Sequence, residues 1–291
     1  MNIFTYKNKK ALSALTLIIA VCGLALMGGC SKDFLKPDPL SIYEPATTFS
    51  TESGLKAALA ISDRHIRSYW TNTGANTNSV VIGTEYMFSD LAVYGKTDVD
   101  GNSVNYNFAD NLKPTGGAAG PGGNDGNYIN HYWEETYNGI KYANTILTYV
   151  DKVGSLSEAT KNAYKGRAYF HRAFRYLALV FQYGDVPLIT KILEVPKQNY
   201  RSTKKAAILD MITKDMEFAV EWVPEQKDMT YIGSVNKGAC RMLLIKCYLA
   251  TGQFQKAKDQ ADVLINQSGY TLMKNTFGTF YPGGEPQTWK I

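Results

Sequence analysis

Several acidic residues of this chain stand close together, as they would in an enzyme that hydrolyses a glycosidic bond. That reaction needs two carboxyl groups that flank the bond. Glu134 is adjacent to Glu135, and Glu85 lies near Asp90 in the sequence. Neighbouring acids are common on helix surfaces, and no nearby residue marks either pair as perturbed. A surface glycosidase is therefore the least favoured of three functions that the sequence leaves open.

Patterns that bind metal ions are incomplete. Asp98-x-Asp100-x-Asn102 begins like a calcium-binding loop, but Ser103 and Ala109 stand where such a loop needs glycine and glutamate. Only a looser calcium contact stays open. The three histidines of the chain are scattered and give no zinc-ligand spacing. The sequence therefore predicts neither a metal site nor a cofactor.

Sugar recognition needs other side chains: aromatic rings that cover the apolar face of a pyranose, with amides and carboxylates at the rim. Residues 71–127 are rich in Asn, Gly, Thr and Ser, and residues 114–126 alone hold six glycines. A loop of this length inside a compact domain is either functional or disordered. We predict that Tyr94 and Tyr106 form a stacking platform, the alternative being that these side chains pack on the helices. The candidate contacts are Trp70, Tyr94, Asn102, Tyr106 and Phe108.

The charge of the chain argues against nucleic acid as a partner. The formal net charge is +5, but Lys7, Lys9 and Lys10 precede residue 30 in a stretch without acidic residues. The remaining residues carry 28 basic and 26 acidic groups. This balance lacks the basic surface that nucleic-acid binding needs.

The first residues have the pattern of a secretory signal. A basic start is followed by an apolar run from Ala11 to Met27, and Gly28-Gly29 stands directly before Cys30. We predict a lipoprotein signal peptide over residues 1–29, with acylation of Cys30 and attachment to a membrane. The alternative is a transmembrane anchor, but the apolar run is slightly shorter than the ~20 residues that a span prefers.

A long helix is predicted over residues 158–183. Its apolar positions recur at helical spacing, Ser157 is a suitable N-cap, and Gly184 with Pro187 would end it. The apolar face holds Phe170, Ala173, Phe174, Leu177 and Phe181, and the opposite face holds Arg167, His171, Arg175 and Gln182. The helix is about 39 Å long at 1.5 Å per residue. It must therefore cross several neighbouring helices.

The rest of the chain is predicted to be helical on both sides of this element. An extended tether over residues 30–50 leads into a helical domain over residues 51–291. Further helices are expected from a cap at Ser50 or Thr51 to Trp70, from Tyr128 onward, and from a cap at Ser202 or Thr203 to Trp222. Cys240 and Cys247 lie seven residues apart on a predicted helix, too far apart for a disulfide. We expect both to be buried as small hydrophobic residues.

The last helical region has the spacing of a tetratricopeptide helix–turn–helix. The positions that carry this spacing are Tyr248, Gly252, Phe254, Ala257, Ala261 and Leu264. Together with the preceding helices, this match predicts a mainly α fold, a stack of tetratricopeptide-like helical hairpins with one long glycine- and aromatic-rich loop.

Two strings of residues resemble the SusD/RagB family of nutrient-uptake lipoproteins from the outer membrane of Bacteroidetes. The first runs from Gly166 to Tyr176 and continues into Tyr183-Gly184-Asp185-Val186-Pro187-Leu188-Ile189. The second is Trp133-x3-Tyr137-x2-Ile140-x2-Ala143-Asn144. The resemblance covers nearly all of residues 30–280. Family members are considerably longer, so it also implies a truncated chain that lacks the C-terminal part.

The resemblance implies a function as well as a fold. It implies a surface lipoprotein, anchored in the outer membrane and facing the cell exterior, that captures an oligosaccharide and delivers it to a TonB-dependent, SusC-like transporter. It also implies a protein that is not an enzyme. The rival from another class is a tetratricopeptide-type scaffold that binds protein, with the aromatic loop as its interface.

Overall fold

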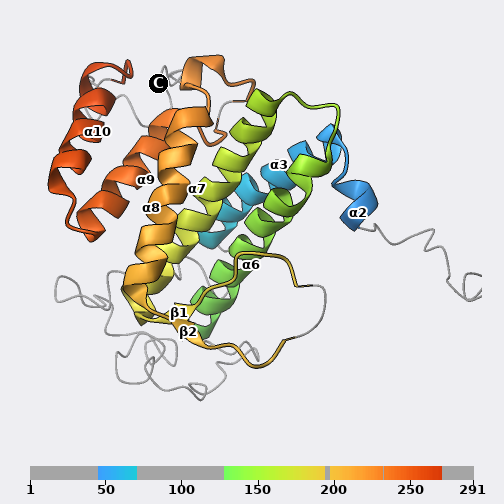
Figure 1. Cartoon of the computed structure of the whole chain (residues 1–291), viewed down its shortest axis with the longest axis horizontal. Coiled ribbons are helices and arrows are strands. Elements are labelled where there is room, and N and C mark those ends of the chain that lie inside the picture. Colours follow the sequence, from blue (N-terminus) through green and yellow to red (C-terminus); the bar gives the residue numbers. More distant parts are fainter. Residues whose placement is uncertain (1–44, 71–127, 194–196, 232, 271–291) are drawn as a thin grey trace, which may run out of the picture. The chain divides into compact units, whose positions relative to one another are not determined.

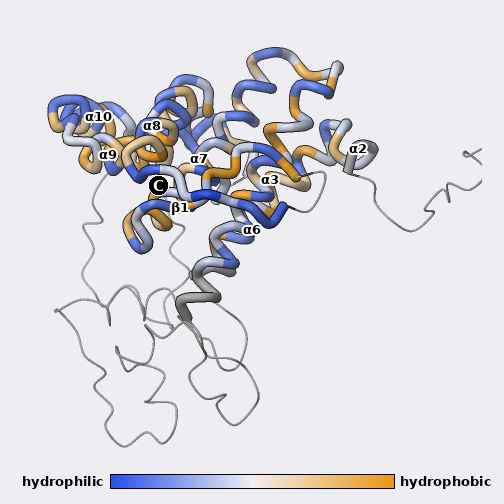
Figure 2. The backbone as a smooth tube through the Cα atoms, turned by 60° about the horizontal axis from the view of Figure 1, so that its bottom comes forward, coloured by the Kyte–Doolittle hydropathy of each residue, from blue (hydrophilic) through white to orange (hydrophobic). Residues whose placement is uncertain are grey.

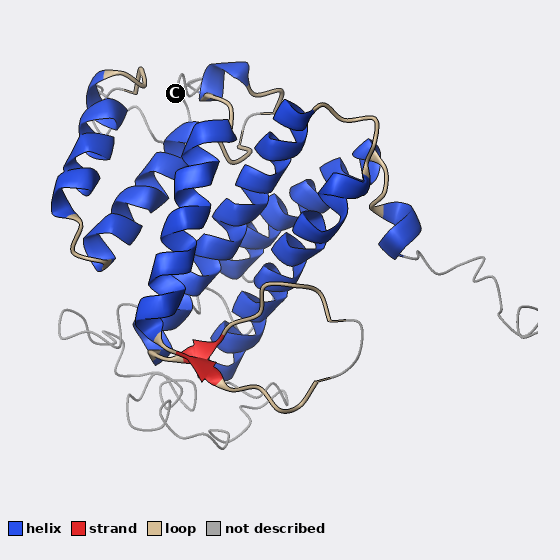
Figure 3. Cartoon of the chain, viewed as in Figure 1, coloured by secondary structure: helices blue, strands red, loops and turns tan. Residues whose placement is uncertain are grey.

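The computed structural model describes residues 45–70, 128–193, 197–231 and 233–270. The chain divides into two units, residues 1–44 and residues 45–291. Everything described lies in the second unit, and the described residues form helices and one very short pair of strands (Figures 1 and 3). The predicted signal peptide, the acylation of Cys30, and residues 30–44 of the tether lie outside the described residues.

The central helix is α7, Glu158–Tyr183, with the bounds that the sequence predicts. The hydroxyl of Ser157 accepts a hydrogen bond from the backbone N–H of Thr160 at 3.2 Å, which caps the first turn. Gly184 has φ of +75°, a conformation that glycine adopts without steric cost, and the helix ends there.

The other helices pack around α7 in a sequence of antiparallel neighbours (Figure 1). On one side lie α3 (Glu52–Trp70) and α6 (Tyr128–Tyr149), both in contact with α7. On the other side α8 (Lys205–Trp222) packs on α7, α9 (Lys237–Ala250) on α8, and α10 (Phe254–Asn266) on α9. The tube in Figure 2 alternates between hydrophilic and hydrophobic residues along these helices, as amphipathic helices do. The predicted stack of helical hairpins is confirmed.

Small residues sit where α7 and α8 cross. A Cβ added to Gly166 would lie 2.7 Å from Cγ2 of Val223 and 3.2 Å from Cα of Ala219. Only glycine allows α7 and the end of α8 to come this close.

Other small residues are also buried as predicted. Ala257 of α10 is 3% exposed, as expected for the crossing with α9. Cys240 and Cys247 are free and buried, as predicted.

The two faces of α7 do not divide simply into one buried and one exposed face. On the polar face His171 and Arg175 are each 1% exposed, while Phe181 on the apolar face is 59% exposed. The reason is that α7 has neighbours on both sides, so its polar side chains meet partners from α3 and α6 instead of water. Phe181 lies near the end of the helix, and its ring faces the ammonium of Lys205 at 4.4 Å.

Two local predictions also differ from the structure. Ser202 and Thr203 form strand β2 (Ser202–Thr203), not an N-cap, and pair antiparallel with β1 (Val186–Pro187). Instead, the backbone N–H of Lys205 at the start of α8 donates a hydrogen bond to the carboxylate of Asp185 at 2.9 Å. The short helix α2 (Pro45–Thr48) replaces extended chain at the end of the predicted tether. No helix in the described part of the chain is both long and apolar enough to cross a membrane.

Candidate functional site

The segment after α7 is attached to α6 and α7 by three side chains. Tyr137 of α6 donates from its hydroxyl to the carbonyl of Pro187 at 2.8 Å. The hydroxyl of Tyr176 accepts from the backbone N–H of Ile189 at 2.6 Å and donates to its carbonyl at 3.1 Å. Asn144 donates to that same carbonyl at 2.9 Å. The residues of the two sequence motifs therefore contact each other, and together they fix the path of residues 186–189.

The amide of Asn144 also connects this segment to a buried ion pair. Its oxygen faces Nη1 of Arg172 at 3.4 Å, and Arg172 donates from Nε and Nη2 to the two carboxylate oxygens of Asp215 at 2.9 Å each. Planar, two-point contacts of this kind are strong and directional. The pair joins α7 to α8, so the segment and both helices form one rigid support.

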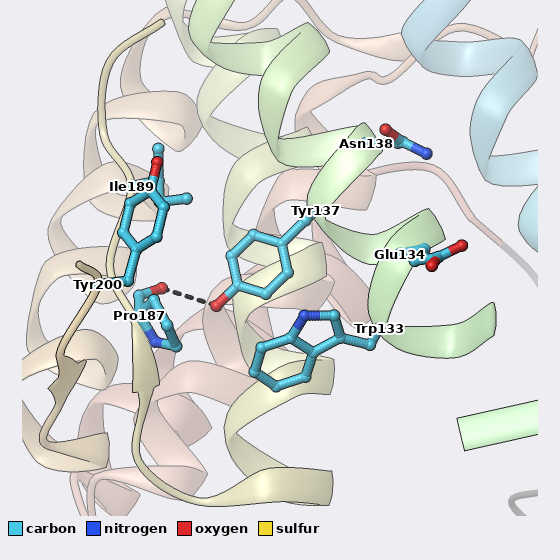
Figure 4. A pocket seen from close by; sticks show the side chains of 7 residues that line it. All are labelled: Trp133, Glu134, Tyr137, Asn138, Pro187, Ile189 and Tyr200. Carbon is cyan, nitrogen blue, oxygen red and sulfur yellow. Dashed lines mark hydrogen bonds between the residues drawn. The ribbon is translucent and has the colours of Figure 1, made fainter. Parts of the chain in front are cut away.

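A pocket with a volume of about 470 Å³ lies on this support. Its walls come from α6 and from the residues at and beside the two strands. Figure 4 shows Trp133 and Tyr137 directed from α6 toward the strand side, with Pro187, Ile189 and Tyr200 facing them and Glu134 and Asn138 at the other edge. The lining residues are Trp133, Glu134, Tyr137, Asn138, Pro187, Ile189 and Tyr200.

The aromatic rings of the pocket are held by one another. Trp133 lies 5.0 Å from Tyr137 and 4.9 Å, edge-on, from Tyr183 between ring centroids. Tyr137 meets Tyr176 edge-on at 6.5 Å. Burial raises the pKa of the Tyr137 hydroxyl, and it raises the pKa of Tyr176 to about 12. Both phenols therefore stay protonated at neutral pH and keep donating to the backbone of residues 187–189.

Polar groups stand beside these rings. Glu134 and Asn138 are exposed at the edge of the pocket. The hydroxyl oxygen of Tyr200 is buried and has no hydrogen-bond partner among the described residues, although the ring as a whole is only partly buried. A buried hydroxyl without a partner is costly, because it has lost its bonds to water. Ring faces beside amide and carboxylate groups suit a sugar.

The residues predicted as sugar contacts are not part of this pocket. Tyr94, Asn102, Tyr106 and Phe108 lie outside the described residues. Trp70 is the last residue of α3, and its side chain also lies outside the described part. Their role stays a prediction.

The sequence interpretation did identify Trp133 and Tyr137, but as helix-packing residues, and it missed Tyr200. The spacing of Trp133 and Tyr137 places both rings on one face of a helix. Tyr200 has no comparable signal, because it comes beside α6 only through the pairing of β1 with β2.

Comparison with known proteins identifies the class. A SusD-like family described as starch-binding and associating with the outer membrane matches residues 71–249, more than half of the chain. The chain therefore belongs to the SusD-like family, as its motifs predict.

Individual relatives agree with this assignment. SusD-like protein P2 of Formosa agariphila is 27% identical over 247 residues, which cover 84% of this chain and 44% of that protein. The chain thus spans about half the length of the curated relatives that it matches.

Solved structures share the fold. Surface glycan-binding protein A from Bacteroides uniformis has a TM-score of 0.63 at 18% identity, over 77% of this chain and 48% of that one. Surface glycan-binding protein A from Bacteroides thetaiotaomicron, in complex with laminarihexaose, has a TM-score of 0.61 at 20% identity, over 81% and 47%. At these identities the likeness establishes the fold.

Proposed function

We propose that this protein binds an oligosaccharide at the bacterial surface, and that the pocket beside α6 provides part of the binding site. The observation that carries the proposal is the pocket itself: the rings of Trp133 and Tyr137 stand on a rigid support and face Tyr200, beside the exposed polar side chains of Glu134 and Asn138. Membership of the SusD-like family, described as starch-binding, supports the same ligand class.

The rigidity of the support matters for this function. Side chains that are already fixed lose little conformational entropy when a ligand binds. The backbone that carries Pro187 and Ile189 is held by Tyr137, Tyr176 and Asn144. Sugar rings would therefore meet a preformed surface. The loop residues Tyr94 and Tyr106 would extend this surface if they lie beside it.

The proposal includes the anchor and the partner. Cys30 carries the lipid that attaches the protein to the outer membrane, facing the cell exterior, and the captured oligosaccharide passes to a TonB-dependent, SusC-like transporter. The protein binds its ligand without hydrolysing it. The apolar run that ends at Gly28-Gly29 before Cys30, together with a family described as associating with the outer membrane, supports the anchor.

A glycan array with the full-length protein tests the ligand class. Laminarihexaose and a xylogluco-oligosaccharide serve as the first probes, because these sugars are bound in two structures of the same fold. We expect saturable binding of at least one oligosaccharide and unchanged chain length of that sugar after incubation. Release of shorter products would contradict the proposal in favour of a hydrolase, and an array without any binding would contradict it in favour of a protein-binding scaffold.

The anchor is tested separately by Cys30→Ala. This variant should lose palmitate labelling and separate from membranes, with Cys22→Ala as the control that keeps both. Continued labelling of Cys30→Ala would contradict the proposed anchor and leave the glycan proposal untouched.

A further inference from the structure

Six ionisable side chains meet where α3 contacts α6 and α7. The hydrogen bonds among them join α3 to α6 and α7, whereas the Arg172–Asp215 pair joins α7 to α8. We call this group the α3 cluster, and its members are Asp63 and His65 from α3, Glu135 from α6, and Arg167, His171 and Arg175 from α7.

The hydrogen bonds of the α3 cluster fix the protonation state of His65. Nη2 of Arg175 lies 2.7 Å from Nδ1 of His65. A guanidinium only donates, so Nδ1 must accept and cannot carry a proton. The other nitrogen, Nε2, lies 2.9 Å from a carboxylate oxygen of Glu135 and donates to it. His65 is therefore neutral in this arrangement, with its proton on Nε2.

His171 is held in the same tautomer. Its Nε2 lies 2.9 Å from Oδ1 of Asp63, whose other oxygen accepts from Nη2 of Arg167 at 2.6 Å. Nδ1 of His171 is buried and has no hydrogen-bond partner among the described residues. A proton added at Nδ1 would place an N–H donor there without an acceptor.

The charges of the α3 cluster balance only when both histidines are neutral. The guanidiniums of Arg167 and Arg175 are matched by the carboxylates of Asp63 and Glu135. Two described groups beside the cluster are neutral: Tyr142 of α6 meets His65 with its ring edge, and Cys240 of α9, near Arg167, stays protonated because burial raises its pKa to about 12. Each protonated histidine would add one positive charge to these six side chains.

Burial makes that extra charge expensive. The side chain of His171 is 1% exposed and that of His65 is 10% exposed. Burial lowers the pKa of both histidines. The positive charge of Arg175 adds to this effect at His65, where Glu135 opposes it, and Asp63 opposes it at His171. A lowered pKa means that the folded protein resists protonation that the unfolded chain accepts below its ordinary value of about 6.5. The stability that the neutral histidines give is complete above that pH and is lost as pH falls below it.

We propose that the contact of α3 with α6 and α7 is a pH-sensitive latch, closed while His65 and His171 are neutral and opened when a proton on Nδ1 of His65 displaces the Arg175 bond. The opening is local to α3, because α3 packs chiefly on α6 and α7. The Arg172–Asp215 pair joins α7 to α8 and contains no histidine, so α8 serves as the internal reference. Helix α3 ends at Trp70, where the predicted sugar-binding loop begins, so the latch would couple acidity to the base of that loop.

Hydrogen exchange followed by mass spectrometry tests the latch in the full-length protein at pH 7.5 and pH 5.5, with rates expressed as protection factors so that the intrinsic pH dependence of exchange cancels. We expect protection of α3 to fall by up to about tenfold per pH unit for each histidine below pH 6.5, while α8 keeps its protection. An equal loss of protection in α3 and α8, or no loss in α3, would overturn the proposal.

Histidine variants identify the groups responsible. In the double variant His65→Asn and His171→Gln, the introduced amides accept from Arg175 and donate to Asp63 without titrating. We expect its α3 protection to be the same at both pH values, whereas His131→Gln, which removes the remaining histidine of the chain, should behave as wild type. Persistent acid sensitivity in the double variant would overturn the proposal.

Nitrogen-15 chemical shifts of the wild-type imidazoles provide a check that needs no variant. At pH 7.5 both rings should be neutral with the proton on Nε2. A doubly protonated His65 at that pH would contradict the latch, because Nδ1 could then not accept from Arg175.

Discussion

Helix α6 has one side at the pocket and the other side packed on α3 and α7, and the two sides have different roles. One side presents Trp133 and Tyr137 to a pocket, with Glu134 and Asn138 exposed at its edge. The other side places Glu135 and Gly139 against α3 and α7, where the α3 cluster is buried. On the pocket side, the rings of Trp133 and Tyr137 are fixed and the pocket lies open beside them. On the packing side, side chains from α3 and α7 fill the space next to α6. We therefore expect changes on the packing side to act on stability, and changes at the pocket edge to act on binding.

The largest loss of stability is expected from breaking the buried ion pair between Arg172 and Asp215. Arg172→Ala removes the two-point contact with Asp215 and leaves a buried carboxylate without its cation. Breaking a buried pair in this way costs about 3–5 kcal/mol. Chemical denaturation should show this loss in the free energy of unfolding.

The matched control is Lys258→Ala, which breaks an exposed pair with Asp262. Exposed pairs contribute about 0–1 kcal/mol. If both substitutions cost the same, the Arg172 pair is not the structural support that the pocket rests on.

The next effect tests the packing side of α6 itself. A Cβ at Gly139 would lie 2.1 Å from Nε of Arg175, so Gly139→Ala must displace that side chain and its bond to His65. Overpacking of this kind costs about 1–3 kcal/mol. Thermal unfolding at pH 7.5 should show the loss.

Gly154→Ala is the control for Gly139→Ala, because a Cβ at Gly154 would meet no described atom within 4 Å. It should be neutral or slightly stabilising, by up to about 1 kcal/mol. A Gly139→Ala protein as stable as the Gly154→Ala protein would show that Arg175 is not confined against α6.

The sequence predicts α7 to the residue because its signals are local. Ser157, the helical spacing of the apolar residues, and Gly184 all act within a few residues of the helix they define. The pocket depends on contacts between distant segments: Tyr200 approaches α6 only because Val186 pairs with Thr203. The buried state of His171 and Arg175 was likewise not predictable from periodicity, since it depends on α3 and α6 covering the second face of α7.

A smaller effect distinguishes the support of the pocket from its open edge. Tyr137→Phe removes the hydroxyl that donates to Pro187 but keeps the ring. Loss of one such hydrogen bond costs about 0.5–1.5 kcal/mol. Unfolding experiments should find this loss together with weaker sugar binding, since residues 187–189 lose one attachment. An unchanged stability would show that this bond does not hold the segment.

The smallest expected change in stability is at the open edge. Asn138→Ala alters an exposed side chain, so the free energy of unfolding should change by no more than about 0.5 kcal/mol. Its affinity for the oligosaccharide should nevertheless fall, because an amide that bonds sugar hydroxyls is lost. Unchanged affinity would remove Asn138 from the site.

The most direct measurement of the central claim is a calorimetric titration of the full-length protein with the oligosaccharide found on the array, comparing wild type, Tyr200→Ala and Tyr231→Ala. Tyr200 lines the pocket, whereas Tyr231 is 69% exposed and does not line it. We predict that Tyr200→Ala raises the dissociation constant about tenfold, equivalent to about 1.4 kcal/mol, and that Tyr231→Ala leaves it unchanged. Equal affinities for wild type and Tyr200→Ala, with both proteins folded, would contradict the assignment of this pocket to sugar binding.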